Sequence, residues 1–93
     1  MRKLKVELFG MARRLSQTKE LEIELGDTGT YRHVVRFLAD KFPSFVGHII
    51  APATYELLEP YFFNVDARRV VRDLDEIPEA DKPLLLLVVD AGG

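Results

Sequence analysis

The stretch "LLLLVV" at 84–89 decides the fold, because it is apolar at six successive positions. Both alternating sets of side chains are apolar, which predicts a strand whose two faces are covered, or one whose second face receives a partner. A segment near the start of the chain, at 3–9, is its natural parallel neighbour, since the long connection that a parallel pair needs lies between them. We therefore expect the first and last strands to form the centre of a sheet.

Two segments near the start of the chain, the one at 3–9 included, alternate apolar and charged residues. These are "KLKVELF" at 3–9 and "ELEIEL" at 20–25, and both have the period of a half-buried strand. Gly10 ends the first and Gly26-Asp27 ends the second. The two segments predict a hairpin whose basic, exposed connection at 11–19 has room for one helical turn.

A helix is predicted from Thr28 or Thr30, either of which can cap it, to about Lys41. Its apolar residues have the spacing of one buried face, and they are Tyr31, Val34, Val35, Leu38 and Phe42. His33, Arg36 and Asp40 fall on the solvated side, and Pro43 stops the helix.

The second half of the chain is less regular. Prolines interrupt residues 43–60, for which we expect irregular structure with a short strand. Residues 61–65 and 69–71, joined by a turn at 66–68, predict a second hairpin. Residues 72–83 form an acidic loop in which we expect Leu74 and Ile77 to pack against the core.

These elements predict an α+β fold, with one helix across a mixed sheet of four or five strands. The chain has 93 residues, of which 47% are hydrophobic and 30% charged, so we expect one domain over 1–93. The arm at 90–93 would then project from a central strand.

Composition excludes several classes of function. A net charge of -2 with interspersed signs gives no footprint for nucleic acid or for a membrane surface. The absence of cysteine removes disulfides, thiolate nucleophiles and cysteine-ligated metals. The chain starts without the apolar segment of a signal peptide, and no run reaches the length of a membrane span, so we expect a cytoplasmic protein.

No residues form a convincing catalytic or metal site. His33 and His48 have no carboxylate at ligand spacing, so surface histidines are the better interpretation. The acidic residues between 73 and 81 can be interpreted as paired carboxylates, but a solvated loop accounts for them better. There is no phosphate-binding loop. We expect no metal, no bound cofactor and no enzyme activity of this chain alone.

The last four residues, "DAGG" at 90–93, follow the apolar strand directly. A segment that ends in two residues without Cβ atoms is narrow and flexible, which suits insertion into a tight slot of another protein. A chance Gly-Gly end is the alternative.

The sequence resembles the ubiquitin-like sulfur carriers, above all the small subunit of molybdopterin synthase, with the thiamine-pathway carrier and the ubiquitin-related modifiers as relatives. The resemblance lies in "VELFGMARRL" at 6–15, in the threonine-containing helix start after "LEIEL", in "FFNVDARRV" at 62–70, and in Gly92-Gly93. It implies the β-grasp fold, which has the element order predicted above.

The resemblance also implies a function and its residues. Gly93 would be the attachment point, Gly92 would permit threading, and Asp90 and Ala91 would complete the arm. A partner enzyme related to the ubiquitin-activating enzymes would use ATP to adenylate Gly93. A sulfur-donor enzyme would then deliver persulfide sulfur to give a thiocarboxylate, and the large subunit of molybdopterin synthase would receive the charged arm.

Docking in the family uses an apolar patch on the exposed face of the sheet, for which Leu85, Leu87, Phe62 and Phe63 are the candidates. A position in the core is the competing interpretation for all four. Three functions remain open: a sulfur carrier in molybdopterin biosynthesis, a protein modifier or thiolation carrier conjugated through Gly93, and a β-grasp interaction module with an incidental tail.

Overall fold

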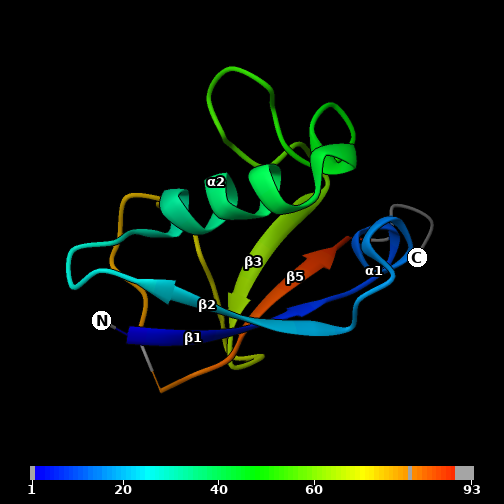
Figure 1. The fold of residues 1–93 in the computed structure, drawn as a ribbon. Helices are drawn as coiled ribbons and strands as arrows, with labels where there is room; N and C mark the ends of the chain where they lie inside the picture. Colours follow the sequence, from blue (N-terminus) through cyan, green and yellow to red (C-terminus); the bar gives the residue numbers. More distant parts are fainter. Residues whose placement is uncertain (1, 80, 90–93) are drawn as a thin grey trace.

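The computed structural model describes residues 2–79 and 81–89. Five strands, two α-helices and one short 3₁₀-helix lie in this part of the chain (Figure 1). They are β1 (Arg2–Leu8), α1 (Met11–Ser16), β2 (Glu20–Leu25), α2 (Tyr31–Lys41), η1 (Pro43–Phe45), β3 (Tyr61–Val65), β4 (Arg69–Val70) and β5 (Leu84–Val88). Both predicted hairpins and the helical turn of the first connection are confirmed.

All five strands form one sheet in the order β2-β1-β5-β3-β4. The first and last strands are its parallel central pair, with Val6 opposite Leu84 and Leu8 opposite Leu86. The outer strands add antiparallel neighbours, β2 along β1 and β3 along β5. The predicted centre of the sheet is therefore confirmed, and β5 has a strand on each side.

Helix α2 lies across one face of the sheet (Figure 1), and the core fills the space between them. Leu84 and Leu86 are buried on this face, whereas Leu85 and Leu87 point to the opposite face and stay half-exposed. Of the two interpretations of "LLLLVV", the one in which a face remains open to a partner describes the structure. We call this face the open face.

Thr30, rather than Thr28, is the N-cap of α2. The backbone N–H of Thr30 donates to Nδ1 of His33 at 2.9 Å, so His33 serves the helix start. Phe42 follows the last residue of α2 and packs against the core, as predicted. In residues 43–60 the expected short strand is wrong: isolated bridges join Val46 to Ile50 and Ile50 to Leu57 instead.

The acidic loop at 72–83 corrects another prediction. Leu74 packs against the core, but Ile77 is 53% exposed and Pro78 is buried in its place. The reason is backbone hydrogen bonding, because the free N–H groups at the start of α2 take carbonyl partners from this loop. Tyr31 N–H donates to Glu76 O at 3.1 Å and Arg32 N–H donates to Leu74 O at 2.8 Å. These bonds fix the loop conformation that turns Leu74 inward and Ile77 outward.

Candidate functional site

The carboxyl end of β5 brings the chain to the predicted functional arm. Val88 lies opposite Tyr61, and the N–H of Val89 donates to the carbonyl of Pro60 at 3.1 Å. Val89 is 55% exposed. The candidate residues Asp90, Ala91, Gly92 and Gly93 lie outside the described residues, so their roles stay predictions.

The start of α1 lies beside this end of β5. Gly10, which precedes α1, has a φ of +60°, a backbone conformation that suits glycine. A Cβ atom at Gly10 would lie 3.1 Å from Cγ1 of Val88, so the absence of a side chain also permits the close approach. The hydroxyl of Tyr61 donates to Sδ of Met11 at 3.6 Å and links α1 to β3. The sequence predicted that Gly10 ends the first strand, but only the folded structure shows that Gly10 contacts Val88.

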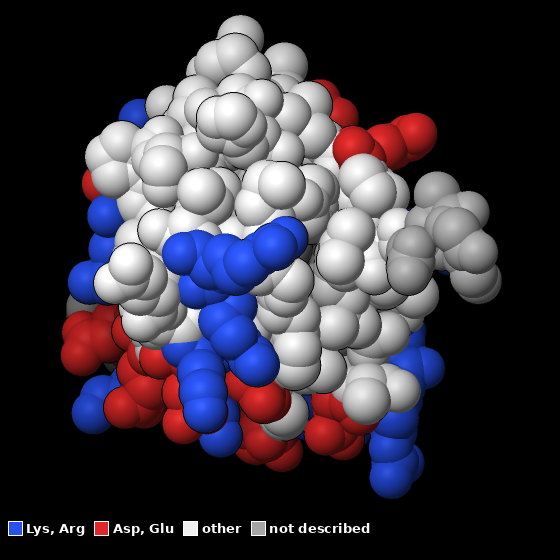
Figure 2. Space-filling view, turned by 90° about the vertical axis from the view of Figure 1, so that its right-hand side faces the viewer, with Lys and Arg blue, Asp and Glu red and all other residues white. Residues whose placement is uncertain are grey.

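The surface around α1 is mostly uncharged, with Lys and Arg side chains across its middle and acidic groups along its lower rim (Figure 2). Helix α1 carries Arg13 and Arg14 in its last turn. Met11 and Leu15, one turn apart on α1, are exposed, as is Val88. Helix α1 and the end of β5 therefore both present exposed apolar side chains, and α1 adds two basic side chains.

The open face carries three of the four docking candidates. Phe62 lies directly opposite Leu87, and Leu85 lies two pairs further along, opposite Asn64. All three are half-exposed, and Val70 of β4 adds a 40% exposed side chain on the same face. We call Phe62, Val70, Leu85 and Leu87 the apolar patch.

Phe63 is placed elsewhere. It is 1% exposed, faces α2, and lies 6.2 Å from Tyr31 between ring centroids. The core position, which the sequence left open for all four candidates, is the one that Phe63 occupies. Val70 was not among the candidates, since "VV" at 70–71 does not reveal which valine faces outward.

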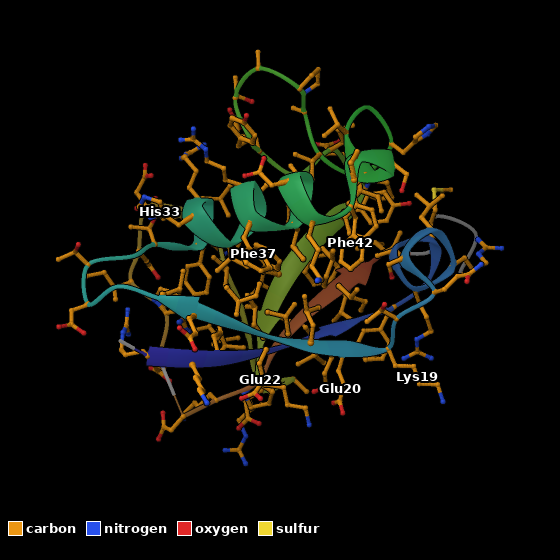
Figure 3. The ribbon with its side chains drawn as sticks, viewed as in Figure 1. Lys19, Glu20, Glu22, His33, Phe37 and Phe42 are labelled. Carbon is orange, nitrogen blue, oxygen red and sulfur yellow. The ribbon has the colours of Figure 1, made fainter. Side chains whose placement is uncertain are left out.

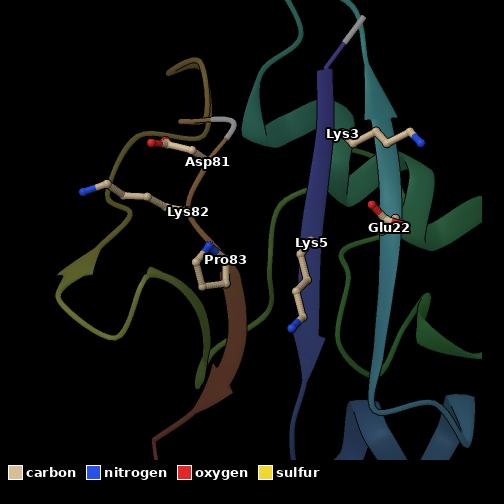
Figure 4. A pocket seen from close by; sticks show the side chains of 6 residues that line it. All are labelled: Lys3, Lys5, Glu22, Asp81, Lys82 and Pro83. Carbon is tan, nitrogen blue, oxygen red and sulfur yellow. The ribbon is translucent and has the colours of Figure 1, made fainter.

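The other half of the open face is charged. Lys3 and Lys5 of β1 and Glu22 of β2 project from it, with Lys82 and Pro83 near the start of β5 (Figure 4). The ammonium of Lys5 lies 2.9 Å from the carboxylate of Glu20, and this partner raises the pKa of Lys5. The open face therefore has an apolar half over β5, β3 and β4 and a charged half over β1 and β2.

Arg32, Asp73 and Asp75 make contacts between α2 and the acidic loop and within that loop. Arg32 pairs with Asp75 at 3.0 Å, and this carboxylate raises the pKa of Arg32. Asp73 accepts a hydrogen bond from the N–H of Asp75 at 2.9 Å. Among residues 2–79 and 81–89 no three metal-ligating side chains gather. Within the same ranges no helix is long and apolar enough to cross a membrane.

No family model matches the chain, and no curated protein matches it. Several solved structures do. Small archaeal modifier protein 1 from Haloferax volcanii is 15% identical with a TM-score of 0.81, over 98% of this chain and 99% of that one. The protein of that name from Methanosarcina acetivorans is 21% identical with a TM-score of 0.79, over 100% and 98%.

A putative molybdopterin converting factor, subunit 1, from Pyrococcus furiosus is also similar. It is 22% identical with a TM-score of 0.72, over 92% of this chain and 95% of that one. At these identities the likeness concerns the fold. The β-grasp, ubiquitin-like fold that the sequence resemblance implied is confirmed, and its structural neighbours carry the names of a modifier and of a molybdopterin converting factor subunit.

Proposed function

We propose that this chain, which has the β-grasp fold, is a sulfur carrier that holds its cargo on the C-terminal carboxylate of Gly93. We propose further that the sulfur is used in molybdopterin biosynthesis. The observation that carries the proposal is the placement of β5, the central strand, whose sequence continues into Gly92-Gly93. The proposal requires that Gly93 carry a free carboxylate.

The anchoring of Val89 limits how far a partner's active site can be. Val89 is held by the carbonyl of Pro60, and the sequence has four residues after it. Four extended residues span at most about 14 Å. A partner that reacts with Gly93 must therefore approach within this distance of Val89, where it meets α1 and the open face.

The chemistry needs activation because a carboxylate is a poor electrophile. The α-carboxyl group has a pKa of about 3.5 and is ionised at neutral pH. A carboxylate oxygen of Gly93 would attack the α-phosphorus of ATP in the activating enzyme, with release of pyrophosphate. A persulfide of the sulfur-donor enzyme would then attack the carbonyl carbon and expel AMP. A second thiol would cleave the resulting acyl disulfide, leaving the thiocarboxylate on this chain and a disulfide on the donor.

The absence of cysteine agrees with this chemistry, because the cargo sits on a carbonyl carbon and the carrier needs no thiol of its own. ATP would be bound by the activating enzyme. The apolar patch is the surface that we assign to docking of that enzyme and, in turn, of the synthase large subunit. Half-exposed Phe62 and Leu87 sit side by side there and offer the apolar centre that interfaces use.

Intact-mass analysis tests the proposal. The full chain is incubated with an activating enzyme of this class, ATP and a persulfide donor. We expect a species heavier by the replacement of one oxygen with sulfur, and fragmentation should assign the change to Gly93. A chain lacking Gly93 should remain unmodified. Absence of the heavier species, with Gly93 present and free, would contradict the proposal.

A matched pair of variants tests the docking surface. Leu87→Asp places a charge in the apolar patch, whereas Ile77→Asp makes the same change on an exposed loop residue. We expect Leu87→Asp to slow ATP–pyrophosphate exchange by the activating enzyme, and Ile77→Asp to leave it unchanged. Equal rates for the two variants, with both folded by circular dichroism, would show that the partner docks elsewhere.

A second candidate is conjugation to other proteins, which the likeness to two structures of small archaeal modifier protein 1 favours. Both candidates begin with adenylation of Gly93 and differ in the acceptor. Conjugation would leave an isopeptide bond to a lysine. Cleavage on the amino side of Asp90 would leave "DAGG" on that lysine, a remnant that a sulfur carrier would not produce. If deletion of Gly92 and Gly93 left the biological role intact, the third candidate, an interaction module, would replace both.

A further inference from the structure

Strand β2 is the edge of the sheet that is long enough to accept another strand. The opposite edge is β4, which has two residues, whereas β2 has six. The N–H of Leu8 donates to the carbonyl of Lys19 at 2.8 Å, and hydrogen-bonded pairs alternate along antiparallel strands. The N–H and C=O groups of Glu20, Glu22 and Glu24 therefore point to the free edge. Among the described residues these groups find no hydrogen-bond partner.

A groove of about 350 Å³ adjoins this edge between β2 and α2. Leu25 of β2 and Gly29 of the following loop line one side, and His33 and Phe37 of α2 line the other. Phe37 is 38% exposed and lies between α2 and β2, whereas Glu20 and Glu22 project on the other side of β2 (Figure 3). A strand added to β2 would place alternate side chains in the groove beside Phe37. The intervening side chains would lie on the open face beside the three glutamates.

The charges of β2 select the occupant. Side chains directly opposite each other on neighbouring strands lie about 4.5–5.5 Å apart, so each residue of an added strand on the open face would meet a glutamate. Lys5 pairs with Glu20 at 2.9 Å. Lys5 and Lys3 of β1 lie opposite Glu22 and Glu24, but among the described residues neither of these two glutamates forms an ion pair. Pairing of β2 with β2 of a second copy would bring glutamates together, which is unfavourable. The complementary strand carries Lys or Arg at alternate positions.

We propose that the free edge of β2 and the adjoining groove bind an extended segment of another protein in which apolar residues alternate with Lys or Arg. Main-chain hydrogen bonds to Glu20, Glu22 and Glu24 would hold the segment, and its apolar side chains would pack against Phe37. This surface lies on β2, whereas the apolar patch lies on β5, β3 and β4, so the segment and the partner of Gly93 would contact different strands.

A synthetic peptide tests the proposal. The probe is a capped hexapeptide of alternating valine and lysine, and the control peptide has glutamate in place of lysine. Both are titrated into the full chain and followed by amide chemical shifts and hydrogen exchange. We expect the basic peptide to shift residues 20–25 and 33–37 and to slow exchange at Glu20, Glu22 and Glu24. Binding should weaken as salt rises from 0.1 to 1 M, because the charges become screened.

Variants separate the backbone contribution from the charge. Glu22→Pro removes the outward N–H, which an edge strand tolerates, and Glu22→Ala removes the charge alone. We expect Glu22→Pro to bind about five-fold more weakly than Glu22→Ala, and Phe37→Ala to weaken binding similarly while Ile77→Ala leaves it unchanged. Deletion of Gly92 and Gly93 should not alter binding. The proposal is overturned by no binding, by equal binding of the acidic peptide, by shifts elsewhere, or by self-association through β2.

Discussion

Replacement of Gly10 by alanine tests the close approach between the start of α1 and Val88 at the end of β5. Gly10 has φ +60° and ψ -131°, a region that residues with a Cβ rarely adopt, and a residue held there costs about 1–3 kcal/mol. The new Cβ would also lie 3.1 Å from Cγ1 of Val88, inside the optimal carbon–carbon separation of about 3.5–4.0 Å. The shifts of side chain or backbone that relieve such crowding typically reduce the free energy of unfolding by at least about 1 kcal/mol.

The two effects together predict a loss of about 3 kcal/mol, which for a domain of this size lowers Tm by about 12–24 °C. Thermal unfolding of the full chain, followed by circular dichroism, measures the loss. Gly47→Ala is the control for the backbone alone, because Gly47 has φ +91° but open space around its Cβ position. Gly26→Ala has neither problem and should be nearly neutral.

A double variant isolates the contact. In a Val88→Ala background, Gly10→Ala should cost about 1 kcal/mol less than in the native chain, because Cγ1 of Val88 is gone. An equal cost in both backgrounds would refute the contact with β5. A Tm for Gly10→Ala as high as that for Gly26→Ala would refute the argument from backbone conformation as well.

Three other changes probe the core, the helix start and the acidic loop. Phe63→Ala should destabilise the fold by about 3–5 kcal/mol in urea denaturation, whereas Phe62→Ala should cost much less and instead weaken docking of the activating enzyme. A larger loss of stability for Phe62→Ala than for Phe63→Ala would contradict the assignment of Phe63 to the core and Phe62 to the apolar patch. Burial raises the pKa of Tyr31 above 10.0, so its contribution to stability is complete below about pH 10 and declines as pH rises further. Because its hydroxyl has no hydrogen-bond partner among the described residues, Tyr31→Phe should preserve stability at neutral pH and reduce the alkaline loss, as unfolding from about pH 8 to 11 would reveal. Leu74→Ala should cost about 1 kcal/mol and Ile77→Ala less than about 0.5 kcal/mol; equal losses would contradict the loop conformation.

Local periodicity predicted the elements in which every second or every third to fourth residue is apolar. The strands β1 and β2 and the buried face of α2 follow from such patterns, because alternation and helical spacing each permit one way to bury the apolar side. The parallel pairing of β1 with β5 followed from the length of the connection between them. The sequence was also enough to predict the apolar strand at 84–89, the Gly-Gly arm after it and the β-grasp fold.

Uniformly apolar segments carried no such information. In "LLLL" at 84–87 and "FF" at 62–63, neither residue set differs from the other in polarity, so the sequence could not tell the core from the docking surface. The structure resolves both through register, with Phe63 opposite Leu86 in the core and Phe62 opposite Leu87 on the open face. The prediction that Ile77 is buried was wrong for a related reason, because N–H groups at the start of α2, distant in sequence, set the loop conformation.

The sequence by itself determined the five strands of the sheet and its main helix, that the last strand is central, and which residues are candidates for the reactive end. The strands and the helix follow from the spacing of apolar residues along the chain, and the central position of the last strand follows from the long connection between it and the first. Only the tertiary structure decided which leucines form the apolar patch, that Gly10 lies against Val88, and that the edge of β2 is unpaired among the described residues and adjoins Phe37. These depend on the strand register and the packing angle of α2, which arise from contacts between residues far apart in sequence.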